Sequence, residues 1–242
     1  VGQALVNASH VLKDSGLLEQ ARSACDFILQ DLRRTETSEG ICFSYSPLDQ
    51  AVVHNASLLG ARLLASVGDA TGDPSLIEIA LSAASFTAAH QRADGAWAYG
   101  SAGHQQWVDH FHTGFILECL HDIHRMTGEA WVRSAFTRGL SYYIKHLFLE
   151  CGAPKYYERQ VYPLDAHSYG QAILTLLRSR MPVRARRVAI QATRDLWHPQ
   201  GYFCYRRTRY YRNQINYLRW SQAWMFRGFA ALASYQLRDI QG

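Results

Sequence analysis

Apolar residues recur at helical spacing along most of this chain. In the segment LLEQARSACDFILQDL, at residues 17–32, Leu18, Ala21, Cys25 and Ile28 follow one another at intervals of three or four positions. That period places them on one face of a helix. The same criterion predicts helices at about residues 1–12, 17–32, 50–67, 75–90, 109–126, 129–148, 164–180, 182–196 and 217–237.

The predicted helices are of two kinds. Helices that begin near residues 54, 112, 167 and 220 are apolar nearly all round, whereas those between them carry a polar face, as in ARRVAIQATRDL. A helix that is apolar on every side is buried. We therefore predict an all-α protein with an inner layer of buried helices and an outer layer of amphipathic helices. Four short aromatic segments, at residues 41–45, 96–99, 155–157 and 202–205, are interpreted as extended loops between helices.

A unit of about 55 residues recurs four times along the chain. Each unit contains a glycine followed by aromatic residues, and the glycines are Gly40, Gly95, Gly152 and Gly201. The inner helix that follows each glycine begins at a polar or aromatic residue, and these four are His54, His112, His167 and Trp220. Repeated helical hairpins bury their apolar faces only against their neighbours. The repeat predicts a single α/α-toroid domain over residues 1–242, an open or incomplete ring in which the helix starts surround one cavity.

The chain begins at Val1, without a methionine, inside a predicted helix, so we expect an N-terminal portion to be missing. No apolar run is long enough to cross a membrane, and no leader pattern is visible. The five cysteines are odd in number and lack CxxC spacing, which is typical of buried thiols in a reducing compartment. These features predict a cytoplasmic protein.

The net charge of +5 is unevenly distributed. Eleven arginines and a single acid, Asp195, lie between residues 178 and 219. A basic surface of this kind attracts polyanions such as acidic polysaccharides, nucleic acids or anionic membranes.

The segment VDHFHTGFILECL carries the clearest candidate chemistry, because Asp109, His110 and His112 open a predicted inner helix. Asp165 and His167 open the next inner helix, with Tyr162 and Tyr169 nearby. Histidines and carboxylates at helix starts are often caps and packed side chains. Converging titratable groups in one cavity are also a candidate site for proton transfer.

Aromatic and arginine side chains supply candidate sugar-binding surfaces. The predicted substrate-binding residues are His54, His110, Trp97, Tyr99, Trp107, Tyr156, Tyr157, Tyr205, Arg206, Arg219, Trp220, Gln222 and Trp224. A solvated charged face is the alternative for the arginine-rich stretch, and a track for single-stranded nucleic acid is another, although no nucleic-acid fold motif accompanies it.

No phosphate-loop, dinucleotide, metalloprotease or serine-hydrolase motif occurs, so we expect no cofactor. Three imidazoles from three helices can hold a transition metal, but such sites leave no local spacing signature. No metal is therefore predicted.

The segments QRADGAWAYG, VDHFHTGFILECL, GAPKYY, YPLDAHSYGQAI and RWSQAWMF resemble helical-toroid proteins encoded in bacterial exopolysaccharide and capsule clusters. The resemblance runs from about Ser46 to Ala231. That toroid is similar to terpenoid cyclases, six-hairpin glycosidases, polysaccharide lyases and the catalytic domain of glucuronyl C5-epimerases. The epimerase resemblance centres on residues 107–113, an aromatic–Asp–aromatic–His–Thr pattern at a helix start. It implies removal of the proton next to a uronate carboxylate. The DxDD-type proton donor of the cyclases is missing.

The resemblance and the residues together predict a protein that acts on an acidic polysaccharide or oligosaccharide in bacterial surface-glycan biosynthesis. In the leading hypothesis, an epimerase or lyase, His112 and His167 transfer or orient protons, Tyr162 or Tyr169 assists, and Arg219 holds the carboxylate. A glycoside hydrolase that uses Asp109 and Asp165 is an alternative. Another is a non-catalytic component that binds glycan or other polysaccharide-assembly proteins.

Overall fold

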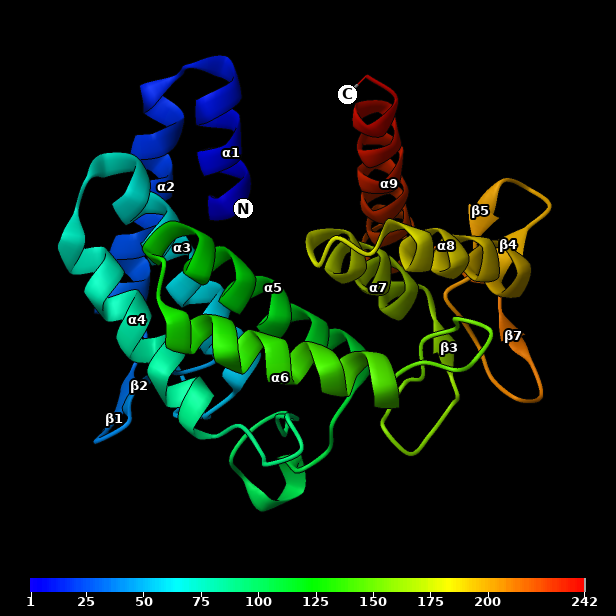
Figure 1. Cartoon of the computed structure of the whole chain (residues 1–242), viewed down its shortest axis with the longest axis horizontal. Helices are drawn as coiled ribbons and strands as arrows, with labels where there is room; N and C mark the ends of the chain where they lie inside the picture. The colour runs from blue at the N-terminus through cyan, green and yellow to red at the C-terminus, as the bar shows by residue number, and fades with distance from the viewer. Residues whose placement is uncertain (242) are drawn as a thin grey trace. The chain divides into compact units, whose positions relative to one another are not determined.

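The computed structural model describes residues 1–241, and it describes side chains as far as residue 237. The chain divides into two compact units, shown together in Figure 1. Unit 1 consists of Val1–Gln106 and Ile116–Leu140, and unit 2 consists of Trp107–Phe115 and the chain from Ser141 onward. A single domain over residues 1–242 stays a prediction.

Unit 1 is built from helical hairpins. Its elements are α1 (Gly2–Leu12), α2 (Ser15–Gln30), β1 (Arg34–Thr37), β2 (Gly40–Phe43), α3 (His54–Thr71), α4 (Pro74–Ala89) and the 3₁₀ turn η1 (Gly103–Gln105). Helix α1 packs on α2, and α3 packs on α4 (Figure 1). Leu58 and Leu64 of α3 are fully buried. Asp73 starts α4 by accepting a hydrogen bond from the Ser75 amide, and Pro74 occupies the first turn, where its missing N–H costs nothing.

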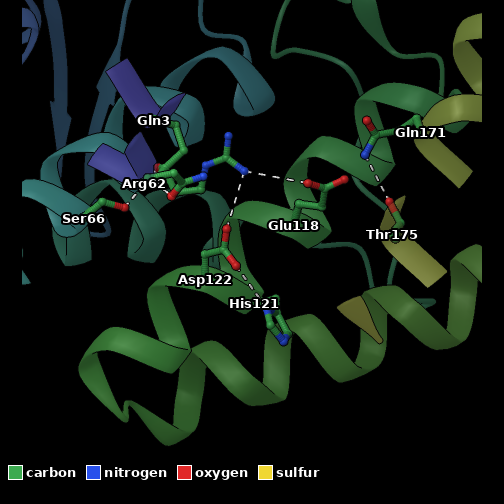
Figure 2. A network of polar contacts seen from close by, with 9 residues as sticks. Gln3, Arg62, Ser66, Glu118, His121, Asp122, Gln171 and Thr175 are labelled. Carbon is green, nitrogen blue, oxygen red and sulfur yellow. Dashed lines mark hydrogen bonds and ion pairs between the residues drawn. The ribbon is translucent and has the colours of Figure 1, made fainter. Parts of the chain in front are cut away.

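Helices α5 (His110–Thr127) and α6 (Ala130–His146) each contribute residues to both units. Within unit 1, α5 places two acidic side chains, Glu118 and Asp122, one turn apart in a buried position. Arg62 of α3 lies 3.8 Å from a Glu118 oxygen and 3.6 Å from an Asp122 oxygen, as Figure 2 shows. His121 contacts the same Asp122 carboxylate through Nδ1, at 3.1 Å. Arg62 thus offsets the negative charge of two buried carboxylates, although its Nε has no hydrogen-bond partner among the described residues.

Unit 2 is built around one fully enclosed helix. Its elements are β3 (Leu164–Asp165), α7 (Ala166–Arg178), α8 (Pro182–Leu196), β4 (Trp197–His198), β5 (Tyr202–Phe203), β6 (Arg206–Arg207), β7 (Arg212–Asn213), the π-helix η2 (Leu218–Gln222) and α9 (Ala223–Gln241). Every side chain of α7 from Ala166 to Leu176 is buried. Helix α8 buries Ala185, Val188 and Ala192 against it and exposes its arginines. The predicted contrast between buried and amphipathic helices is thus confirmed for α7 and α8.

The four glycines of the repeat share one backbone property. Gly40, Gly95, Gly152 and Gly201 have φ angles of 134°, 97°, 94° and 89°. Residues with a side chain rarely adopt φ angles in this range, so each unit requires glycine at this place. The repeat read from the sequence therefore marks a turn that recurs in the structure.

The aromatic segments differ from the prediction that they are loops. Residues of β2 pair with β1, and Tyr202–Phe203 pairs with β4, so two of the four segments form short antiparallel ladders. A third, at residues 155–157, makes isolated bridges through Tyr157. A further small sheet was not predicted, with strand order β3-β6-β7. Strands of two residues carry no alternation from which a sequence pattern could identify them.

Three predicted helices begin later than expected. Helix α3 starts at His54 rather than at about residue 50. Residues 164 and 165 belong to β3, where Asp165 stands opposite Arg206, so α7 starts at Ala166. The last helix opens with the π-helical turn η2 before α9 begins at Ala223. Among the described helices, none combines the length and apolarity that a membrane crossing requires.

Candidate functional site

The first turn of α5 holds a carboxylate and an imidazole in direct contact. Asp109 precedes the helix, and its Oδ1 accepts a hydrogen bond from the His112 amide at 2.9 Å. Its Oδ2 contacts His112 Nδ1 at 2.6 Å and accepts a hydrogen bond from Trp107 Nε1 at 3.1 Å. Helix starts favour a carboxylate in this role, because the first amides have no partner in the helix. One aspartate therefore both starts the helix and anchors a histidine.

The contact with Asp109 determines how His112 can act. A carboxylate on Nδ1 holds the proton there in the neutral ring, which leaves Nε2 as the nitrogen that can accept a proton. The Asp109 side chain is 2% exposed, whereas that of His112 is 22% exposed. His112 is thus an oriented imidazole that solvent or a ligand can reach, the arrangement required of a general base.

Asp165 plays the same structural part at the start of α7. Its Oδ1 accepts a hydrogen bond from the His167 amide at 2.9 Å, and its side chain is buried. Burial raises the pKa of Asp165 to about 6, although the His167 amide and the nearby Arg206 partly oppose that rise. A carboxyl group with this pKa exchanges protons near neutral pH, as a catalytic acid must.

Replacing Asp165 by asparagine should stabilise the protein above pH 7 by about 1–3 kcal/mol, because the raised pKa costs the native state about that much. Between pH 4 and 6 the native carboxyl binds more protons than the unfolded one, so the stability of the native protein falls as the pH rises through this window. Asparagine carries no charge and remains a good helix cap.

Urea unfolding of wild type and Asp165→Asn at pH 3.5 and pH 7.5 tests this expectation. The two proteins should be equally stable at the lower pH and should differ at the higher pH. Asp14→Asn is the matched control, because Asp14 also caps a helix, α2, but is exposed. An Asp165→Asn protein that is less stable than wild type at pH 7.5 would contradict the expectation.

His167 is buried between aromatic rings. Its ring stacks on Phe111 at 4.5 Å between centroids and lies 4.2 Å from Trp224 and 5.9 Å from Trp220. Burial lowers the pKa of His167 to about 3, and the charges of His112 and Arg227 lower it further. Its Nε2 has no hydrogen-bond partner among the described residues. His167 is therefore a neutral ring that can hydrogen-bond to a ligand, rather than an imidazolium acid.

Phe111 connects the two helix starts, and sequence reasoning missed it. The centroid of its ring lies 4.2 Å from that of His112 and 4.5 Å from that of His167, so both predicted histidines contact one ring. Phe115, one turn later, contacts His167 at 5.7 Å and Trp224 at 5.5 Å. The sequence DHFH, in which Phe111 lies between two histidines, was the one available indication of its role. A phenylalanine has no titratable or polar group that would mark it as a site residue. We call Asp109, His112, Asp165, His167 and Phe111 the dyad cluster.

Tyrosines border the dyad cluster. The pKa of Tyr156 is raised, first by burial and then by the negative charge of Asp165, and Asp109 adds to the effect. Burial also raises the pKa of Tyr157 and of Tyr205. Their phenols consequently stay protonated and are suited to donating hydrogen bonds. They are poorer candidates than His112 for the proton acceptor.

A cavity of about 360 Å³ has Trp107, Tyr157 and Glu158 among its lining residues. Trp107 is 36% exposed, and its indole N–H bonds to Asp109. A flat aromatic surface beside polar side chains suits a sugar ring. Arg206 packs over Tyr205 at 4.3 Å and donates a hydrogen bond to its hydroxyl.

Several predicted site residues stabilise the fold of unit 2 and do not face a binding surface. His110 is fully buried against Tyr143 and Phe148, and burial lowers its pKa to about 3. Tyr169 lies in the apolar core, where its hydroxyl donates a hydrogen bond to Asp195 at 2.5 Å. Neither side chain exposes a surface to a ligand. Gln222 ties η2 to β5 through both the N–H and the C=O of Phe203.

The remaining predicted residues lie either on the surface of unit 2 or in unit 1. Tyr162, Arg219 and Trp220 are exposed, with Arg219 over the Trp220 ring at 5.6 Å. Trp97 of unit 1 is buried and donates a hydrogen bond to the Thr87 carbonyl, and Tyr99 of unit 1 accepts one from the His54 amide.

His54 is buried in unit 1 beside Phe86 and His90, and burial lowers its pKa to about 4. Three of the four helix starts, at His112, His167 and Trp220, therefore come together in unit 2. The convergence of His54 with them stays a prediction. Within the described part of the chain, no group of three or more His, Cys, Asp or Glu side chains is arranged to hold a metal ion.

Comparison with known proteins identifies the fold. The sequence matches no protein-family model and no curated protein. Solved structures do match over almost the whole chain. Cellobiose 2-epimerase from Bacillus thermoamylovorans has a TM-score of 0.80 at 12% identity, with 96% of this chain and 68% of that chain covered.

Two further structures agree with that result. Unsaturated glucuronyl hydrolase from Bacillus sp. GL1 has a TM-score of 0.72 at 15% identity, and the match covers 96% of this chain and 71% of the hydrolase chain. A GH76 α-mannanase from Bacteroides thetaiotaomicron has a TM-score of 0.73 at 14% identity, and the match covers 98% of this chain and 68% of the mannanase chain. These proteins are six-hairpin glycosidase-like α/α toroids. The chain therefore has the all-α, α/α-toroid fold that the repeat predicted.

Proposed function

We propose that the chain is a carbohydrate-active enzyme whose dyad cluster moves a proton at C5 of a uronic acid residue. The observation that carries this proposal is the 2.6 Å contact between Asp109 and His112, which presents an oriented imidazole at a helix start. An acidic polysaccharide or oligosaccharide is the proposed substrate. Surface-glycan biosynthesis and a cytoplasmic location stay predictions.

The proposed reaction begins with proton abstraction by His112 Nε2. The C5–H bond breaks, and its electron pair delocalises into the neighbouring carboxylate as an enediolate. Arg206, which stands opposite Asp165 across β3 and β6, supplies positive charge for that intermediate. His112 becomes an imidazolium that Asp109 stabilises.

The intermediate has two outcomes. In an epimerase, a second acid returns a proton to C5 from the opposite face. In a lyase, the C4–O bond breaks, a C4=C5 double bond forms, and the leaving oxygen takes a proton. Asp165, with a pKa raised to about 6, is the proposed proton donor in both cases. The protonated phenols of Tyr156 and Tyr205 would position the sugar.

The structural neighbours support this substrate class. One is named an unsaturated glucuronyl hydrolase and another a cellobiose 2-epimerase, so related folds include proteins named for a uronyl substrate and for epimerisation. The arginines near the dyad cluster favour an acidic sugar over a neutral one.

Glycoside hydrolysis is the second candidate, favoured by the buried Asp165 carboxyl as a general acid. It requires Asp109 as the partner carboxylate. Asp109 is 2% exposed and engaged by His112 and Trp107, which is unfavourable for a nucleophile. A non-catalytic glycan-binding component is the alternative if no reaction is found.

Incubation with uronate polymers and oligomers in deuterated water separates these functions. Deuterium at C5 identifies an epimerase, ultraviolet absorbance from a new double bond identifies a lyase, and new reducing ends without either signal identify a hydrolase. The proposal expects one of the first two signals. Binding without any reaction across the panel would overturn it.

A further inference from the structure

We infer that the outer face of α8 is a second binding site for acidic polysaccharide, separate from the dyad cluster. The inference rests on the proposed function only for the identity of the polymer. No residue that lines this face belongs to the dyad cluster.

Two adjoining cavities define the face. One, of about 590 Å³, extends from Cys151 along α8 to Arg194. The other, of about 360 Å³, lies between the end of α6 and α8 and includes Lys145. Arg184 and Arg187 line both cavities, so the two lie next to each other, and we call them together the basic groove.

Among the described side chains, carboxylates leave most of the positive charge in this groove unpaired. Arg184, Arg187 and Arg194 are exposed, and none of them pairs with a carboxylate among the described side chains. Of the described residues that line the groove, Glu150 is the one acid. The acid of α8 itself, Asp195, faces the core, where it is bonded to Tyr169 and Arg207.

The spacing of the arginines gives the groove a direction. Arg184, Arg187 and Arg194 lie on one face of the helix, with the neutral Gln191 between the last two, and at 1.5 Å per residue they extend over about 15 Å. Like charges three positions apart on a helix repel each other by a few tenths of a kcal/mol. A bound anion would reduce this repulsion between the arginines. A row of guanidinium groups matches a linear chain that carries a carboxylate at regular intervals.

The lining between the arginines is apolar. Phe148 and Leu149 line the smaller cavity, and Val183 and Ile190 line the larger one. Val183 and Ile190 are exposed, at 82% and 49%. Alternating apolar and cationic contacts suit pyranose rings with carboxylate substituents, since arginine binds carboxylates in a forked geometry while ring C–H groups pack on aliphatic surface. A concave groove fits an extended chain better than a flat lipid surface.

The test measures binding of fluorescently labelled polygalacturonate by polarisation, at several salt concentrations. The triple variant Arg184→Gln/Arg187→Gln/Arg194→Gln should bind about tenfold more weakly than wild type and show a weaker salt dependence. The control variant, Lys13→Gln/Arg125→Gln/Arg133→Gln, loses the same charge from exposed positions of unit 1 and should bind within about twofold of wild type.

Two further arms make the result specific. His112→Asn should retain wild-type polymer binding, so that failure of the proposed reaction is distinguished from failure of this site. Poly-glutamate, single-stranded DNA and vesicles containing anionic lipid should compete more weakly than polygalacturonate. Equal binding by the groove variant and its control would overturn the inference. So would stronger, groove-dependent binding of any of the other three polyanions.

Discussion

Replacing His112 by asparagine is expected to lower kcat on the uronate substrate about 10²- to 10⁴-fold, the usual contribution of a positioned general base. Asparagine retains the helix and the amide that bonds to Asp109 Oδ1, but it has no nitrogen that accepts a proton. KM should change little, because the ring acts mainly in the transition state. The measurement is the rate of deuterium incorporation or double-bond formation described above.

The variant Asp109→Asn tests the contact between Asp109 and His112 from the side of the carboxylate. The asparagine amide keeps the helix cap but no longer selects the His112 tautomer that has its proton on Nδ1, so kcat should again fall while the protein stays folded. His10→Asn, at an exposed position of α1, is the control for both variants. Retention of activity within about threefold in His112→Asn would exclude His112 as the base.

The second large effect concerns stability. Arg62→Met should destabilise the protein by about 3–5 kcal/mol, because removing the arginine leaves Glu118 and Asp122 buried together without that cation. Methionine fills a similar volume, so lost packing contributes little. Urea unfolding at pH 7 measures the change.

An exposed arginine provides the comparison for Arg62. Arg22 lies 3.1 Å from Asp73, with side chains that are 49% and 24% exposed. Exposed pairs of this kind contribute about 0–1 kcal/mol, so Arg22→Met should have a small effect. Equal losses in the two variants would show that the buried network does not stabilise the native state specifically.

The helices and the repeat were predictable from the sequence because the patterns that indicate them extend over many residues. Apolar period and capping residues together located α2, α4, α5 and α8 to within a few residues, and the glycine turns marked each repeat. The small sheet of β3, β6 and β7 was not predictable, because pairing Asp165 with Arg206 depends on a contact between residues far apart in sequence.

The candidate site was predictable in part. The contact between Asp109 and His112 is local, three residues apart at a helix start, so sequence spacing could indicate it. The other two histidines look alike in sequence and are both buried, and they differ in their neighbours. His110 packs on Tyr143, whereas His167 contacts Phe111 and Trp224. The buried network of Arg62 was missed, although acidic residues four apart in an apolar helix, Glu118 and Asp122, were its visible signal.

Asp109 and Asp165 each bind a backbone amide through Oδ1, and this makes the His112 and His167 amide protons reporters of the site. Their hydrogen-exchange rates measure how often the first turn of α5 or α7 opens. Inactivation on mild heating can therefore be followed at two amides. If it results from fraying of a helix start, those protons will exchange before the protein as a whole unfolds.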